Sequence, residues 1–194
     1  MTAFSRLVRA RRMVRAYRPE PVDPAVIDRM LDIARRGPSA GFSQGESFVV
    51  VTDPEVRSEI ARACGEPAYV ARGFTLWIST APVHVVPCTR RADYEDRYAE
   101  PDKAGSSVES WPVPFWWVDA GAALMLLLLA AVDEGLAAGF LRADPGRLRA
   151  ALSIPPDVAP LGVVTIGHPA PDRRSGSLAR GRKPLEEVVH RDRW

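Results

Sequence analysis

The sequence predicts an α+β sandwich built around one mixed sheet. Its 194 residues are 46% hydrophobic, which suits one globular domain with a full core. Segments with a strand pattern alternate with segments at helical spacing, and several connections between strands are too short for a helical crossover. Such a pattern favours an α+β fold over a parallel α/β fold. No internal repeat or linker divides the chain, so we expect a single domain over residues 1–194.

Aspartate-proline pairs mark three helix starts, because Asp caps a first turn and Pro suits its first position. These pairs begin at Asp23, Asp53 and Asp144. Gly37-Pro38 and Gly135 mark helix ends. Together with apolar residues at helical spacing, these signals predict helices over residues 4–11, 24–36, 54–64, 68–77, 118–134 and 145–152.

Short runs rich in β-branched residues predict strands over residues 48–51, 82–87, 136–141 and 162–167. We expect the first of these strands at the centre of the sheet. Residues 89–114 lack periodicity, which predicts an irregular segment that continues to residue 117 and is either a lid or simply mobile. Residues 171–194 form a charged C-terminal arm.

Bulk composition argues against several function classes. The net charge is only +2, so no overall field favours nucleic acid or an anionic membrane. Cys64 and Cys88 form neither a disulfide framework nor a metal-binding spacing, and we expect no metal site. Residues 1–12 lack the apolar run of a secretory signal, and the apolar stretch 120–132 is shorter than the ~20 residues of a membrane span. We expect a soluble, cytoplasmic protein.

Two arginine clusters are candidate anion-binding sites, because guanidinium groups bind phosphate through paired donors. The first holds Arg11, Arg12 and Arg15, with Arg11 and Arg15 on one helical face. The second holds Arg180 and Arg182 in the C-terminal arm. A solvated basic helix, a nucleic-acid or localisation patch, and an exposed basic tail are the alternative interpretations.

A polar turn follows the second predicted helix. Backbone N–H groups of this turn and the Ser39 hydroxyl can face a ligand, and Gln44 offers both a donor and an acceptor. Such groups suit the pyrimidine edge of a planar heterocycle. The alternative is an ordinary connection from a helix to a strand.

Four motifs in order resemble the FMN-dependent nitroreductase superfamily. They are Arg-Arg-x-Val-Arg at 11–15, Pro-Ser-Ala-x-x-x-Gln at 38–44, Val-Asp-Ala-Gly at 118–121 and Arg-x-Arg-x-Pro-Leu-Glu-Glu at 180–187. The resemblance covers about residues 5–194. It implies a three-layer sandwich in which helices flank a mainly antiparallel sheet. It also implies an intertwined homodimer with two active sites at the subunit interface.

The resemblance further implies bound FMN. The arginine clusters would contact its phosphate and flavin edge, the polar turn its ring or ribityl chain, and the segment after the apolar helix the flavin face and N5. The implied cofactor-binding residues are Arg11, Arg12, Met13, Arg15, Pro38, Ser39, Ala40, Gln44, Ala138, Gly139, Arg180 and Arg182.

The implied reaction is hydride transfer from NADH or NADPH, through flavin N5, to an aromatic, quinone-like or nitro acceptor. The cofactor carries this chemistry, so no catalytic side chain is expected. The acceptor is expected to meet aromatic and charged residues of the 89–117 segment, although these aromatics could equally pack at a dimer interface. The candidate substrate residues are Tyr94, Tyr98, Lys103, Trp111, Phe115 and Trp116.

The sequence departs from the family pattern at several positions. Many relatives have Ser at Met13, Asn at Phe42 and Pro-Trp at Gly45-Glu46, so a polar contact to the flavin is missing at Phe42. Three rival functions stay open: a dedicated reductase of a biosynthetic or deazaflavin intermediate, a flavin-sequestering protein without turnover, and a nucleic-acid-binding module built on residues 6–18. The sequence identifies neither the acceptor nor the nicotinamide.

Overall fold

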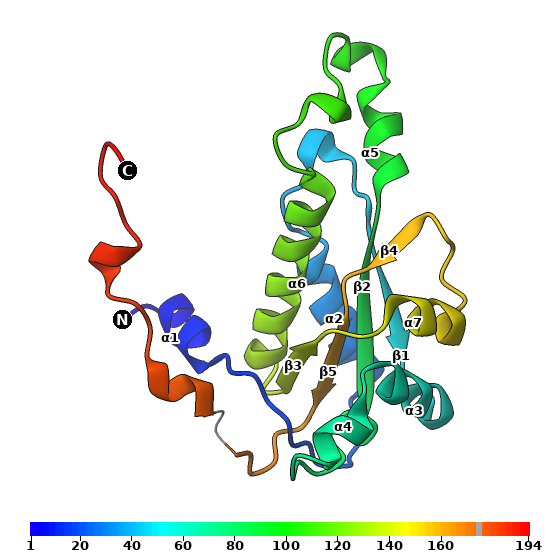
Figure 1. Cartoon of the computed structure of the whole chain (residues 1–194), viewed down its shortest axis with the longest axis vertical. Coiled ribbons are helices and arrows are strands. Elements are labelled where there is room, and N and C mark those ends of the chain that lie inside the picture. The colour runs from blue at the N-terminus through cyan, green and yellow to red at the C-terminus, as the bar shows by residue number, and fades with distance from the viewer. Residues whose placement is uncertain (174–175) are drawn as a thin grey trace.

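The computed structural model, which describes residues 1–173 and 176–194, confirms an α+β sandwich with one sheet between two layers of helices (Figure 1). The five strands are β1 (Glu46–Val51), β2 (Val83–Arg90), β3 (Ala137–Leu141), β4 (Val158–Pro160) and β5 (Val163–Gly167). Their order across the sheet is β1-β2-β5-β3. Strand β4 lies off this path and also pairs with β2. Every pairing between these strands is antiparallel, so the prediction of a mixed sheet is corrected to an antiparallel one.

Three helices, α2, α3 and α7, begin where the aspartate-proline pairs predict. Asp23, Asp53 and Asp144 each accept backbone N–H groups of the turn that follows, at 2.9 to 3.0 Å. The α-helices are α1 (Ala3–Ala10), α2 (Pro24–Ala34), α3 (Pro54–Ala63), α4 (Glu66–Val70), α5 (Arg91–Tyr98), α6 (Phe115–Asp133) and α7 (Pro145–Leu152). Short 3-10 turns are η1 (Ala40–Phe42), η2 (Pro101–Lys103), η3 (Val108–Ser110), η4 (Gly176–Arg180) and η5 (Leu185–Glu187).

Two hydrophobic clusters cover the two faces of the sheet. Along β2, Val83 and Val85 belong to the cluster that packs under α2 and α6. Val86 and Cys88 belong to the other cluster, which packs under α3 and α7. This alternation follows from the two-residue period of a strand and places a full layer of helices on each side.

Three expectations about individual elements were wrong. Residues 91–98, expected to be irregular, form α5, whose only buried residue is Tyr94. The strand at residues 48–51 lies at the edge of the described sheet, next to β2 alone, and not at its centre. The helix expected over 68–77 is the shorter α4, and turns follow it. A charged helix with one buried side chain gives no apolar period, which is why the sequence did not show α5.

Helix α6 packs one face inside the fold and leaves the other face apolar and exposed. Ala123, Leu127 and Ala131 are buried against α2 and the sheet, whereas Val118 and Met125 keep nearly half of their surface exposed. By length and composition α6 could cross a membrane. Its packing against α2 and the sheet identifies it as a core helix of the fold.

A buried histidine links β2 to the segment after α4. His84 is fully buried, and its Nε2 lies 2.7 Å from the carbonyl oxygen of Ile78. Its Nδ1 has no hydrogen-bond partner among the described residues. Burial lowers the pKa of His84 from 6.5 to about 4, so the folded state holds the neutral ring.

We predict that His84 makes the protein acid-sensitive. In the unfolded chain His84 is protonated below pH 6.5, whereas in the folded chain it is protonated only below about pH 4. The free energy of unfolding therefore falls as the pH drops through this window. A pKa shift of this size corresponds to a change of roughly 3 kcal/mol in the free energy of unfolding. Urea unfolding between pH 7.5 and 4 would measure it. His84→Gln should flatten the pH dependence, whereas His190→Gln, at an exposed position, should not; equal slopes in all three proteins would contradict the assignment.

Candidate active site

The segment after α1 packs directly against β3. The backbone N–H of Val14 donates to the carbonyl oxygen of Ala138 at 3.2 Å. The backbone N–H of Arg15 donates to the Asp172 carboxylate at 2.9 Å. The segment thus joins β3 to the start of the C-terminal arm, and it carries the first arginine cluster to this place (Figure 1).

Gly139 leaves room for this packing because it has no side chain. A Cβ at Gly139 would lie 2.5 Å from the carbonyl oxygen of Val14 and 3.1 Å from both Met13 Cε and the Tyr17 hydroxyl. A side chain of any size would therefore push the 13–17 segment away from β3. Met13 and Gly139, both expected to bind the cofactor, meet here.

A buried hydroxyl pair fixes the same contact. The Tyr17 hydroxyl lies 3.0 Å from the carbonyl oxygen of Val14 and 2.8 Å from Thr165 Oγ1. Thr165 Oγ1 lies in turn 3.2 Å from the carbonyl oxygen of Gly139. Burial raises the pKa of Tyr17, so its hydroxyl stays protonated and able to donate. Sequence reasoning missed Tyr17 and Thr165 because neither belongs to a recognisable motif.

Arg15 lies over an aromatic cluster. Its Cζ is 5.8 Å from the ring centre of Phe74 and 5.9 Å from that of Trp77. Contacts of this kind attract the guanidinium to the ring faces and restrict its position. The N–H groups of the Arg15 side chain make no hydrogen bond within residues 1–173 and 176–194, which keeps them available to an anionic or carbonyl-rich ligand.

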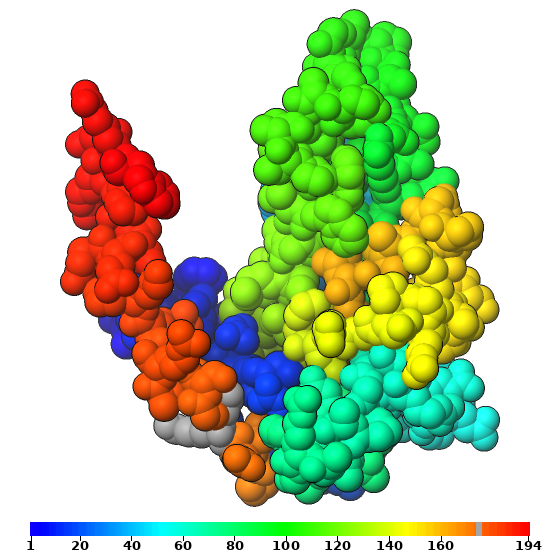
Figure 2. All heavy atoms as spheres, in the orientation of Figure 1, coloured from blue at the N-terminus to red at the C-terminus, as the bar shows by residue number. Residues whose placement is uncertain are grey.

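Arg11 and Arg182 line one hollow, although they come from opposite ends of the chain. The hollow measures about 700 Å³ and lies between α1 and the C-terminal arm, with Arg9 also on its wall. Figure 2 shows the arm standing apart from the body, with the N-terminal segment between the lower half of the arm and the body. Several guanidinium groups around one space suit a phosphate group. Arg12 and Arg180 are exposed and do not line this hollow.

The Pro38–Gln44 turn has an unusual backbone. Gly41, Phe42 and Gln44 have φ angles of 63°, 58° and 52°. The left-handed region costs a non-glycine residue of order 1–3 kcal/mol, and such strain concentrates at functional sites. The Ser39 hydroxyl accepts the backbone N–H of Gln44 at 2.8 Å, so it serves the turn itself. Pro38 and the Gln44 side chain are exposed.

Asp119 holds this turn from the inside. Its Oδ2 accepts the backbone N–H of Ala40 at 2.8 Å and the Tyr94 hydroxyl at 3.0 Å, and the carboxylate is buried. Glu46 lies nearby; burial raises its pKa, and the Asp119 charge adds to this effect. Asp119 belongs to the Val-Asp-Ala-Gly motif, but no pattern in the sequence indicates its bond to Ala40.

The candidate substrate residues form a packed aromatic cluster. Trp111 makes edge-to-face contacts with Tyr98 and Phe115, with ring centres 4.9 and 5.2 Å apart, and it lies 6.1 Å from Trp116. Lys103 Nζ lies 5.4 Å from the centre of the Tyr98 ring. These five side chains are half-buried and keep some surface for a ligand. Tyr94 is fully buried, so the expectation that it stacks on an acceptor does not fit.

The structure divides the predicted cofactor residues into two groups. The segment that carries Arg11, Met13 and Arg15 packs through Met13 and Val14 on Ala138 and Gly139 of β3, the strand that follows the C-terminal end of α6. The Pro38–Gln44 turn lies against Asp119 in its N-terminal third (Figure 1). Since an α-helix rises about 1.5 Å per residue, roughly 20 Å of α6 separates the two groups. A single chain does not bring both groups to one ligand.

Known proteins share this architecture and sequence. The Nitroreductase family model matches residues 8–168. The protein named FMN reductase (NAD(P)H) of Bacillus subtilis (strain 168) is 31% identical over 191 residues, which cover 94% of this chain and 71% of that protein. A NADPH-dependent oxidoreductase of Staphylococcus aureus (strain MRSA252) is 24% identical over 97% of this chain and 72% of its own length.

The fold agrees with these sequence matches. The solved structure of the hypothetical oxidoreductase YcnD from Bacillus subtilis superposes with a TM-score of 0.78 at 28% identity, covering 100% of this chain and 75% of that one. This chain therefore shares its three-layer architecture with that protein. The chain belongs to the nitroreductase family.

We predict that Gly139→Ala disturbs the packing of the 13–17 segment on β3. Its methyl group would overlap the Val14 carbonyl oxygen, so the free energy of unfolding should fall by about 1–3 kcal/mol. Urea unfolding measures the change. Gly146→Ala is the matched control, because among the described residues its Cβ would meet only Asp144 Oδ1, at 3.4 Å, and alanine favours a helix. Equal stability of the two variants would contradict the close approach at Gly139.

Proposed function

We propose that this protein is an FMN-dependent NAD(P)H oxidoreductase that reduces an aromatic, quinone-like or nitro acceptor. Membership of the nitroreductase family and the names of the two curated relatives support the cofactor and the donor. The observation that carries the proposal is the meeting of Arg11 and Arg182 at one hollow, with Arg11 two residues along the chain from Met13, which packs on Gly139.

These residues fit a phosphorylated planar cofactor. Arg11 and Arg182 would hold its phosphate through charge-assisted hydrogen bonds. Arg15, restricted by Phe74 and Trp77, would donate to the carbonyl-bearing edge of the ring and stabilise negative charge there. When bound, FMN supplies hydride transfer between the nicotinamide and the acceptor at its N5. The half-buried aromatic cluster around Trp111 would orient the acceptor by ring contacts.

We further propose that the protein acts as a cytoplasmic homodimer whose sites lie between subunits. The distance along α6 between the two groups of cofactor residues supports this, because a second copy can bring its turn to the arginine cluster of the first. Exposed apolar side chains, which an interface would bury, also support the dimer. They lie along α6 at Trp117, Val118 and Met125, and along the arm at Leu178, Leu185 and Val188.

The first experiment tests cofactor and donor together. Purified protein is titrated with FMN, and then with NADH or NADPH without oxygen. We expect flavin absorbance near roughly 370 and 450 nm that bleaches with the nicotinamide. Bound flavin that only dithionite reduces would instead indicate a sequestering protein, and a single acceptor turned over far faster than nitroaromatics would indicate a dedicated reductase.

The matched variant in this titration is Arg11→Gln. Loss of one charge-assisted contact to phosphate should weaken FMN binding about tenfold or more. Riboflavin has no phosphate, so its affinity should stay unchanged. Arg62→Gln, on α3 and away from the hollow, is the control. A variant that loses riboflavin and FMN equally would refute the assignment of Arg11 to the phosphate.

Met125→Glu tests the dimer. A carboxylate on the exposed face of α6 would place charge in the proposed interface, so sedimentation should show monomers and FMN binding should fall with it. Leu76→Glu is the control, because Leu76 is similarly exposed but lies far from α6 in sequence, beside α4. A monomeric wild-type protein that binds FMN fully would rule out the shared site.

A further inference from the structure

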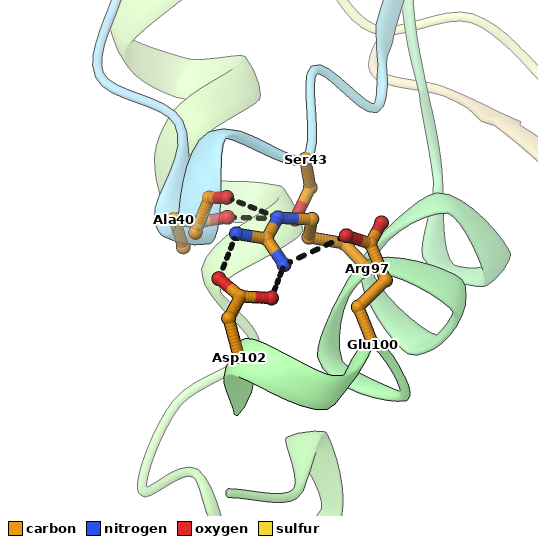
Figure 3. Close-up of polar contacts among 6 residues, drawn as sticks. Ala40, Ser43, Arg97, Glu100 and Asp102 are labelled. Atoms are coloured by element: carbon orange, nitrogen blue, oxygen red, sulfur yellow. Dashed lines mark hydrogen bonds and ion pairs between the residues drawn. The ribbon is translucent and has the colours of Figure 1, made fainter. Parts of the chain in front are cut away.

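Arg97 joins the segment after β2 to the Pro38–Gln44 turn (Figure 3). Its Nε donates to the carbonyl oxygen of Gly41 at 2.8 Å. Its Nη1 and Nη2 donate to the two carboxylate oxygens of Asp102, each at 2.8 Å, and Glu100 accepts a further bond at 3.2 Å. The planar guanidinium is thus held on two sides, which fixes its orientation as well as its position.

The peptide group that Arg97 contacts belongs to the strained part of the turn. Gly41 has a φ of 63°, and the residue after its carbonyl, Phe42, has a φ of 58°. The Tyr98 ring packs on the same place, because a Cβ on Gly41 would lie 2.6 Å from its Cε2. Helix α5 therefore contacts the turn twice. Tyr98 packs against Gly41, and Arg97 donates a hydrogen bond to the Gly41 carbonyl oxygen. Surroundings of this kind are what keep a strained backbone in one conformation.

We propose that Arg97 is a positioning residue for the flavin, an inference that rests on the proposed function. The Arg97–Asp102 pair ties the conformation of the turn to the order of residues 100–110, which belong to the segment expected to meet the acceptor. Coupling between two sites is reciprocal. Binding of the flavin against the turn therefore also orders the acceptor segment, and a disordered acceptor segment weakens flavin binding.

A second ion pair of the same kind provides a matched comparison. Arg29 donates through Nε and Nη2 to the two carboxylate oxygens of Glu134, at 2.8 and 2.7 Å. This pair joins α2 to the end of α6 and does not contact the turn. Exposed ion pairs contribute little to stability on average, so neither arginine is expected to be essential for folding.

The experiment measures flavin affinity in wild type, Arg97→Ala, Arg97→Lys and Arg29→Ala, with riboflavin and FMN as separate probes. Because Arg97 acts on the ring-side turn, Arg97→Ala should weaken both probes by a similar factor, about tenfold. Lysine can donate to the Gly41 carbonyl but cannot bridge Asp102 in the same plane, so Arg97→Lys should restore part of the affinity. Arg29→Ala should bind both probes as wild type does. The melting temperatures of the two alanine variants should agree within a few degrees.

The outcomes separate this proposal from the proposed function. Wild type that takes up neither probe would end the proposed function, and the role of Arg97 with it. Wild type that binds flavin while Arg97→Ala and Arg29→Ala bind equally well would overturn the role of Arg97 alone. If Arg97→Ala does not fold, the Asp102→Asn variant provides the test. It removes the Arg97–Asp102 ion pair and leaves the hydrogen bond from Arg97 to the Gly41 carbonyl oxygen. Weaker binding of riboflavin by Asp102→Asn supports the proposal, and unchanged binding overturns it.

Discussion

Packing of residues 13–17 against β3 is the contact on which the rest of the candidate site depends. The bond from Val14 to Ala138 fixes where the chain leaves α1. Farther on, the backbone N–H of Arg18 donates to the carbonyl oxygen of His168, and Tyr17 forms an isolated antiparallel β-bridge with Pro169. The first segment therefore runs beside the extension of β5, and both ends of the chain reach the same side of the sheet. That arrangement places the two arginine clusters near each other, and the absence of a side chain at Gly139 permits it.

The same arrangement keeps the two groups of candidate cofactor residues apart within one chain. The arginines gather where α6 ends, whereas the polar turn is anchored near its start through Asp119. No rearrangement of side chains can bridge the length of a rigid helix. The outer face of α6 carries exposed apolar side chains in its first half, from Trp117 to Met125. In the proposed dimer, one event, the addition of a second copy, would both complete the site and bury this face.

Local signals in the sequence predicted most helices and strands, because a cap or an apolar period depends on residues close together in the chain. Asp23 and Asp144 cap the predicted helices for this reason. The edge position of β1 depends on sheet order, which no local pattern records. Helix α5 escaped prediction since its sequence is charged, and Arg97 belongs to no motif, so its bond to Gly41 became visible only once α5 was in place. Residues of the candidate site were found from motif order, and their division into two groups required the fold.

Phe42 illustrates how the turn fits an assembled site. The sequence pattern suggested a missing polar contact at this position, and the structure shows a side chain that is 73% exposed on a left-handed backbone. A large apolar group held in water, on a strained backbone, costs free energy in the isolated chain. Asp119 anchors the turn from inside and Arg97 anchors it from α5, so the outward direction of Phe42 is imposed by both contacts. A surface that covers Phe42 would recover this cost, and the ring-binding side of a second subunit is the surface that the proposed dimer brings to it.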